Sequence, residues 1–207
     1  LDSSGTAAVR QANAKRFSEV ANKTEHQPSL IITSPPYCNA IEYTRRHRLE
    51  SEWLGLWDGG SLAEIRNSRI STSREFFGSH TLRQSTLDEV SAVPHKEIEE
   101  TIQTIETDKQ QEKKANRLRK YFLDAYDWLS ELYEALPSGG LLCMTVGPST
   151  SYGVNIDTPR FLREIATDAV GFDTESKRRY TYKNNKMQYP TDGPSTEYEE
   201  LMKLRKR

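Results

Sequence analysis

One tetrapeptide carries the clearest chemical signal in this sequence of 207 residues: Ser34-Pro35-Pro36-Tyr37. Neither proline has a backbone N–H, so the free polar groups are carbonyl acceptors and the Ser34 hydroxyl. Such a site can accept hydrogen bonds from an exocyclic amino group, and the Tyr37 ring offers a flat face on which a base could stack. The alternative is a proline-rich turn that only ends a strand, and the tetrapeptide alone leaves both interpretations open.

The tetrapeptide follows an apolar run, Leu30–Thr33, which predicts a buried strand of a parallel sheet. Ligands of open α/β sheets bind beyond the carboxyl ends of the strands, so this place suits an active site. A second buried strand is predicted at 141–146, after Pro and Gly residues end a helix at 136. The remaining pattern predicts helices over 41–57, 98–105, 118–136 and 161–170, and strands over 7–13, 172–182 and 197–204. Gly171 is expected to end the helix over 161–170. Alternating strands and helices predict an α/β sheet.

Length and composition exclude several classes of protein. The chain has room for one domain with a long insertion, and 29 basic against 30 acidic residues give a net charge of −1, which names no partner. Two cysteines exclude a disulfide scaffold and are too few for a zinc site, so we expect no metal. No apolar run reaches the roughly 20 residues that cross a bilayer, and the N-terminus shows no signal-peptide pattern, which predicts a cytoplasmic protein without a membrane partner.

The motifs resemble those of the amino-methylating, S-adenosylmethionine-dependent DNA methyltransferases. Their catalytic motif is Asp, Asn or Ser followed by Pro-Pro and an aromatic residue, and the Ser form seen here is most typical of the N4-cytosine enzymes. Further segments match the family in its order: 39–43, 46–50, 52–55, 136–140, 146–149, 158–172 and 197–206.

This resemblance implies a fold, an organisation and an activity. The expected fold is a doubly wound, Rossmann-like class I methyltransferase sheet, incomplete in this chain, with residues 1–57 and 121–207 as the catalytic domain. Residues 58–120 would be a loop and helical insertion that could recognise the target. The expected reaction transfers a methyl group to the amino group of a flipped base in double-stranded DNA. Cytosine N4 is favoured over adenine N6, within a prokaryotic or phage restriction-modification system.

The resemblance also assigns roles to residues. Ser34 and the Pro35 carbonyl would hold and polarise the target amine, while Tyr37 stacks on the flipped base. Because the methyl sulfonium is already activated by its charge, geometry would supply most of the catalysis. Thr33 and Pro36 would help line the donor pocket.

Two downstream residues, Tyr43 and His47, could shape the same pocket, but ordinary helix packing explains them equally well.

This chain departs from the family pattern in the segments that would bind the methyl donor. Complete members carry a glycine-rich turn, yet the eleven glycines here include no Gly-x-Gly. Where the family usually has an acidic residue near the adenine, this chain has Asn13, which could still bind the adenine amine. Either a second polypeptide or a missing segment supplies the turn, or this copy does not bind the donor. Because the catalytic tetrapeptide is intact, we expect missing or separately supplied sequence.

Basic residues cluster near the C-terminus, together with two tyrosines. Phosphates attract such a patch and aromatic rings can stack on bases, although a solvated hairpin face would look the same. The cluster comprises Lys177, Arg178, Arg179, Lys183 and Lys186. Arginines of the long loop, at positions 66, 69, 74 and 83, are a second candidate for DNA contact.

Two alternatives to a DNA methyltransferase remain. A methyltransferase acting on the N2 amino group of guanine in tRNA uses a similar motif, although usually with Asp in place of Ser34. A non-catalytic DNA-binding subunit of a methyltransferase complex would explain the missing Gly-x-Gly.

Overall fold

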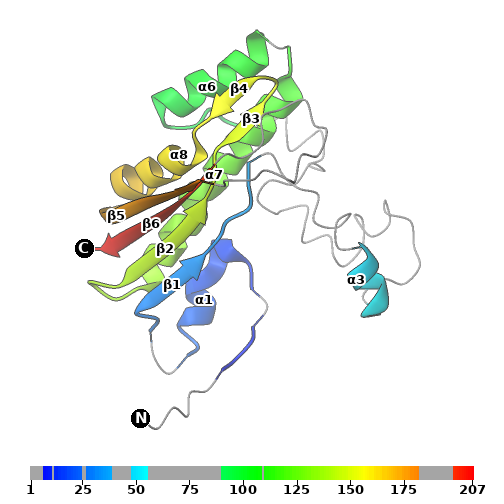
Figure 1. Cartoon of the computed structure of the whole chain (residues 1–207). Helices are drawn as coiled ribbons and strands as arrows, with labels where there is room; N and C mark the ends of the chain where they lie inside the picture. Colours follow the sequence, from blue (N-terminus) through cyan, green and yellow to red (C-terminus); the bar gives the residue numbers. More distant parts are fainter. Residues whose placement is uncertain are drawn as a thin grey trace.

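The computed structural model describes residues 7–10, 12–24, 27–38, 48–55, 90–108, 110–181 and 198–207. Its main sheet has the order β1-β2-β6-β5, and a separate hairpin consists of β3 and β4. The strands are β1 (Leu30–Thr33), β2 (Leu141–Val146), β3 (Ser149–Ser151), β4 (Val154–Ile156), β5 (Phe172–Thr181) and β6 (Tyr198–Lys206). The helices are η1 (Ala14–Arg16), α1 (Phe17–Ala21), α3 (Arg48–Trp53), α6 (Lys96–Thr107), α7 (Glu112–Ala135), α8 (Thr158–Glu164) and η3 (Ile165–Val170). Figure 1 shows this mixed arrangement, which confirms the predicted α/β class.

The sheet contains both strand directions. β1 runs parallel to β2, with Leu30 opposite Leu141, whereas β6 runs antiparallel to both β2 and β5. A bulge between Thr174 and Ser176 shifts the register of β5 against β6. The predicted strands at 30–33, 141–146, 172–182 and 197–204 are therefore confirmed, with small changes at their ends.

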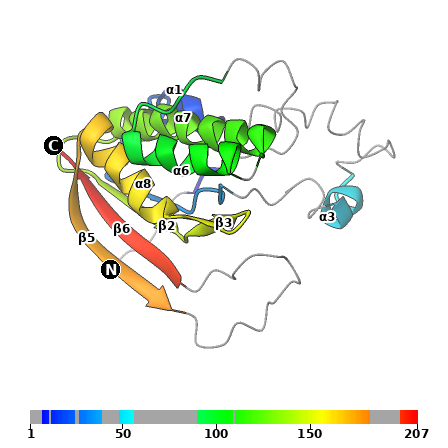
Figure 2. The same cartoon turned by 90° about the horizontal axis from the view of Figure 1, so that it is seen from above.

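The described helices α1, α6, α7 and α8 lie on one side of this sheet, as Figure 2 shows. Burial alternates accordingly along β1, where Ile31 is buried and Ile32 is 75% exposed. Burial also alternates along the paired strands β2 and β6. Leu142 and its partner Leu204 are buried, whereas Cys143 and its partner Lys203 are not. In the described part of the chain, the apolar side chains of β1 on the other face are open to solvent.

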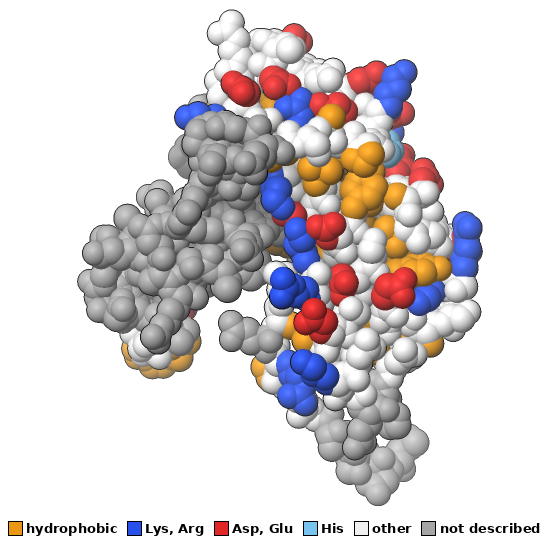
Figure 3. Space-filling view, turned by 180° about the vertical axis from the view of Figure 1, so that it is seen from behind, with side chains coloured by type: hydrophobic (Ala, Val, Ile, Leu, Met, Phe, Trp, Pro, Cys, Tyr) orange, Lys and Arg blue, Asp and Glu red, His pale blue; other side chains and the backbone are white. Residues whose placement is uncertain are grey.

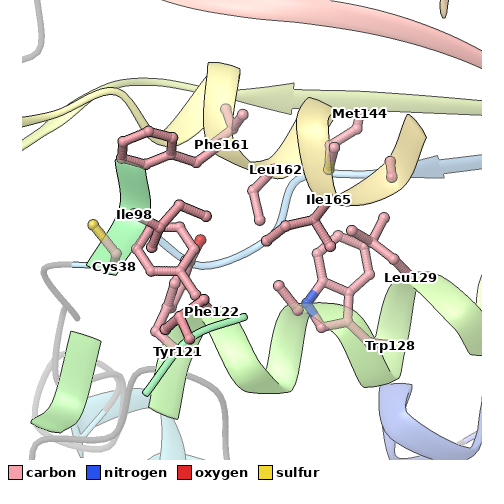
Figure 4. Packing of buried hydrophobic residues seen from close by; sticks show 14 of the residues in the cluster. Cys38, Ile98, Tyr121, Phe122, Trp128, Leu129, Met144, Phe161, Leu162 and Ile165 are labelled. Atoms are coloured by element: carbon pink, nitrogen blue, oxygen red, sulfur yellow. The ribbon is translucent and has the colours of Figure 1, made fainter. Parts of the chain in front are cut away.

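The core forms between the sheet and helix α7, which is apolar along one side. Figure 4 shows Tyr121 and Phe122 of α7 facing Phe161 and Leu162 of α8. The Phe122 ring meets the Tyr121 and Phe161 rings edge-on, with centroids 5.1 and 5.7 Å apart. Gly171, with φ of +106°, ends η3 in the left-handed conformation that glycine adopts readily, as the sequence predicted.

The outer side of the helix layer carries charges of both signs (Figure 3). Lys15 reaches the carboxylates of Asp124 and Asp127 at 2.6 and 2.8 Å, which ties the N-terminal segment to α7. Arg119 of α7 pairs with Glu99 of α6 at 2.6 Å. This mixture of opposite charges makes the described helix layer unlike a surface that binds nucleic acid.

Three features of the structure differ from the sequence expectations. The predicted strand over 7–13 is wrong for its described residues, because Asn13 instead caps η1. The hairpin β3–β4 was not expected, since its turn is Tyr152-Gly153 rather than Asn-Gly. Both turn residues have positive φ values, of 51° and 79°, as a two-residue hairpin requires. Only Arg48–Trp53 is helical in the described part of the predicted 41–57 helix.

The predicted insertion over 58–120 is described only from residue 90 onward. Its helix α6 buries Ile98, Ile102 and Ile105 in the core, and its proposed end at residue 120 falls inside α7. The described half of this region therefore packs into the same core as the main sheet, and the division into a domain and an insertion stays a prediction. None of the described helices is long and apolar enough to span a bilayer.

Two neighbouring isoleucines of β1, one buried and one exposed, test whether only one face of the sheet is covered. We expect Ile31→Ala to lower the unfolding free energy by about 2–5 kcal/mol, because it leaves a cavity in the core. Ile32→Ala should lower it by less than about 1 kcal/mol, since that side chain is largely exposed. Urea unfolding of both variants measures the difference, and equal losses would show that the open face is covered.

Candidate active site

The tetrapeptide leaves the sheet at the carboxyl end of β1, beyond Thr33. The two prolines cannot continue the hydrogen-bond ladder, so β1 ends there. Ser34 is exposed, Pro35 is buried, and Pro36 and Tyr37 are half-buried. The backbone is therefore anchored in the protein while the Ser34 side chain remains accessible to a substrate.

Two side chains from distant parts of the chain hold this tetrapeptide. The Tyr121 hydroxyl of α7 donates to the Pro36 carbonyl at 2.9 Å. The Tyr37 hydroxyl donates to the Glu199 carboxylate of β6 at 2.6 Å. Sequence reasoning missed Tyr121 and Glu199, which are 85 and 162 residues from their partners. Tyr121 lies in no matched segment, and the matched 197–206 segment gave Glu199 no role.

The residue after the tetrapeptide, Cys38, anchors the chain in the core. Its sulfur lies 3.4 Å from the Thr158 hydroxyl at the start of α8, and both residues are buried. Burial raises the pKa of the Cys38 thiol, so the thiol stays protonated at neutral pH and is a poor nucleophile. This cysteine has a structural role beside the candidate site.

The predicted donor-binding residues fit only part of a methyl-donor site. Thr33 is half-buried at the end of β1, next to the tetrapeptide. The side-chain oxygen of Asn13, which an adenine amine would need, accepts the Lys15 backbone N–H at 3.0 Å and caps η1. The sequence contains no Gly-x-Gly, the turn that the family resemblance leads us to expect at the donor site. Tyr43 and His47 lie outside the described residues.

The structure describes three of the five basic residues of the predicted C-terminal cluster. Lys177, Arg178 and Arg179 are exposed on β5, whereas Lys183 and Lys186 lie outside the described residues. Arg179 is also engaged within the protein, because it lies 3.8 Å from the Tyr198 ring centroid and 3.6 Å from the Glu200 carboxylate.

The pairing of β5 with β6 places this basic strand near the tetrapeptide. Tyr180 pairs with Glu199, the same residue that accepts the Tyr37 hydroxyl, and Arg179 pairs with Glu200. A polyanion lying along β5 would therefore run close to the Tyr37 ring.

The arrangement can bind and orient an amine. Ser34 and the tetrapeptide carbonyls present acceptors on a backbone that has few ways to move, and an aromatic ring stands beside them. In the described residues, no three His, Cys, Asp or Glu side chains gather as a metal site would require.

Comparison with known proteins gives the family context. No family model matches the sequence. Type II methyltransferase M.AvaI, from Nostoc sp. and from Anabaena variabilis, is 26% identical over 151 residues, or 70% of this chain and 31% of the relative. Type II methyltransferase M.BsoBI from Geobacillus stearothermophilus is 44% identical over 45 residues, or 22% of this chain and 9% of that protein.

A solved structure of a Thermus thermophilus protein, assigned as a DNA modification methylase and complexed with S-adenosyl-L-methionine, is also similar. It is 15% identical, with a TM-score of 0.42, over 92% of this chain and 50% of that one. The chain spans about a third of the length of the M.AvaI relatives described above. Its similarity to Type II methyltransferases confirms the family resemblance that the tetrapeptide and the ordered motifs indicated.

Proposed function

We propose that this chain is the amine-binding catalytic part of a DNA methyltransferase that uses S-adenosylmethionine and methylates cytosine N4. The observation that carries the proposal is the tetrapeptide itself, with Ser34 exposed at the carboxyl end of β1 on a backbone that is otherwise buried or half-buried. The similarity to Type II methyltransferases supports it and favours a role in restriction-modification in the bacterial cytoplasm.

The proposed chemistry of this chain is binding and orientation. The Ser34 hydroxyl and the Pro35 carbonyl accept hydrogen bonds from the target amino group, which draws that nitrogen out of the base plane and exposes its lone pair. Tyr37 stacks on the flipped base and fixes its distance from Ser34. The donor supplies an electrophilic methyl group, so no strong general base is needed and geometry provides most of the rate increase.

We further propose that a glycine-rich turn from outside this sequence completes the donor site. Strand β1 is the last described strand on its side of the sheet, and its Leu30 and Ile32 side chains are 48% and 75% exposed. A parallel strand is normally covered on both faces, so these exposed side chains support an additional segment or a second polypeptide beside β1.

DNA contact is proposed for the exposed basic residues of β5 and for the predicted loop insertion. Lys177 and Arg178 would contact phosphates, and their strand pairs with the one that carries Glu199. Residues 58–89 of the insertion, with their four arginines, would take part in target recognition.

The alternatives make different predictions about product and donor. A tRNA methyltransferase would label the guanine N2 amine, whereas the sequence with Ser at position 34 favours cytosine. A non-catalytic subunit is favoured by one observation, the absence of Gly-x-Gly, and would bind DNA without binding the donor.

A labelling experiment tests the reaction. The full-length protein, or this chain with its completing polypeptide, is incubated with tritiated S-adenosylmethionine and either duplex DNA or tRNA. We expect label in DNA, recovered as N4-methylcytosine after digestion to nucleosides. Ser34→Ala should lower turnover at least about a hundredfold because the amine loses an oriented acceptor, while donor affinity changes little.

Several outcomes of this experiment would contradict the proposal. Label in tRNA alone would favour the RNA enzyme, and N6-methyladenine would correct the target base. Equal losses of turnover and donor affinity in Ser34→Ala would contradict the role given to that hydroxyl. If no nucleic acid is labelled, calorimetry with S-adenosylhomocysteine decides between an inactive subunit and an enzyme with another substrate.

The contact with DNA is tested separately by removing two charges from β5. We expect the Lys177→Ala/Arg178→Ala variant to bind duplex DNA more weakly, and its plot of log affinity against log salt to be shallower by about two units. The control, Lys96→Ala/Lys113→Ala, removes the same charge from exposed positions of α6 and α7. Equal effects of the two pairs in a fluorescence anisotropy titration would mean that β5 provides only general attraction.

A further inference from the structure

We infer that Tyr121 and Glu199 are positioning residues that fix the place and the long axis of the Tyr37 ring. Neither belongs to the Ser-Pro-Pro-Tyr tetrapeptide, and both act through it rather than on a substrate. The effect on catalysis rests on the proposed function, whereas the effect on the tetrapeptide does not.

The tetrapeptide needs such support because of its composition. Pro35 and Pro36 have no N–H groups, and the segment lies beyond the end of β1, so a strand ladder cannot hold it. The two prolines can be held only through their carbonyls and by packing, and the aromatic ring through packing and the phenol group. The structure shows a hydrogen bond of each kind.

The first bond controls the backbone beside the ring. Tyr121 is completely buried, and its ring packs edge-on against Phe122, so its hydroxyl has little freedom. By donating to the Pro36 carbonyl, it sets the orientation of the peptide group that joins Pro36 to Tyr37. One lone pair of the Pro36 carbonyl is thereby used within the fold, which is consistent with the amine-binding role proposed for Ser34 and Pro35.

The second bond controls the far end of the ring. Glu199 belongs to β6 and pairs with Tyr180 of β5, so its backbone is part of the sheet. Its carboxylate accepts the Tyr37 hydroxyl at 2.6 Å, and a hydrogen bond to a charged group is stronger than one between neutral groups. The ring is then held at its backbone end by α7 and at its hydroxyl end by β6.

A ring held at both ends presents a fixed face to a base. If the ring could tilt, a base stacked on it would lose its alignment with Ser34, and misplacement of about 1 Å can cost about a hundredfold in rate. Glu199 and Tyr121 would thus affect turnover more than substrate or donor affinity. This differs from a purely structural role, in which all activities would fall together with the folded fraction.

Hydrogen exchange tests the positioning role without using activity. Tyr121→Phe and Glu199→Ala should each speed exchange of the Tyr37 and Cys38 amides about tenfold, while the strands β2 and β6 remain protected. Glu199→Gln retains an acceptor oxygen and should restore most of the protection. The control, Tyr126→Phe, removes a hydroxyl from the same helix, where it donates to the Pro94 carbonyl at 3.5 Å, and should leave both amides unchanged.

A double-variant cycle tests whether Glu199 acts through the Tyr37 hydroxyl. In the Tyr37→Phe background, Glu199→Ala should cause no further increase in exchange and no further loss of kcat. Additive effects, or unchanged exchange in both single variants, would overturn the inference. If the wild-type protein labels no nucleic acid, the proposed function fails while the exchange data still decide the positioning role. If DNA is methylated normally by Tyr121→Phe and Glu199→Ala, the positioning role fails and the function stands.

Discussion

The loss of backbone donors at two consecutive prolines is the constraint on which the candidate site depends. It ends β1, frees the chain to turn out of the sheet, and leaves acceptors where an amine could bind. It also means that the segment cannot hold itself in place, so α7 and β6 must supply hydroxyl and carboxylate partners. The order β1-β2-β6 makes this possible, because it brings the C-terminal strand within reach of a residue near the N-terminus.

The sequence was most informative where a local pattern determines local structure. The apolar runs of β1 and β2 predicted buried strands, and Gly171 predicted the end of a helix, because in each case neighbouring residues suffice. Tyr121 and Glu199 could not be predicted, since their roles depend on contacts across 85 and 162 residues. Asn13 has a local role that its place in the motif did not indicate, because its side chain caps a short helix, and its assignment to the cofactor stays a prediction.

The described helices cover only one face of the main sheet, and the uncovered face bears on the proposal that a glycine-rich turn comes from outside this sequence. The described helices cover one face, and the other presents Leu30 and Ile32 beside the candidate site. Exposed aliphatic side chains on a parallel strand are unfavourable in water, so a segment that covers them would gain stability as it completes the donor site. Folding and donor binding would then be coupled in the whole protein.

The bulge in β5 sets the register of the basic strand. Side chains alternate between the two faces of a strand, so the extra residue at the bulge decides on which face each following residue lies. If Glu175 paired with Lys203 instead of forming the bulge, Lys177, Arg178 and every later residue of β5 would lie on the opposite face. Deleting Glu175 would remove the bulge and keep Lys177 opposite Met202, so a relative with a strand one residue shorter and no bulge should present its basic residues on the same faces.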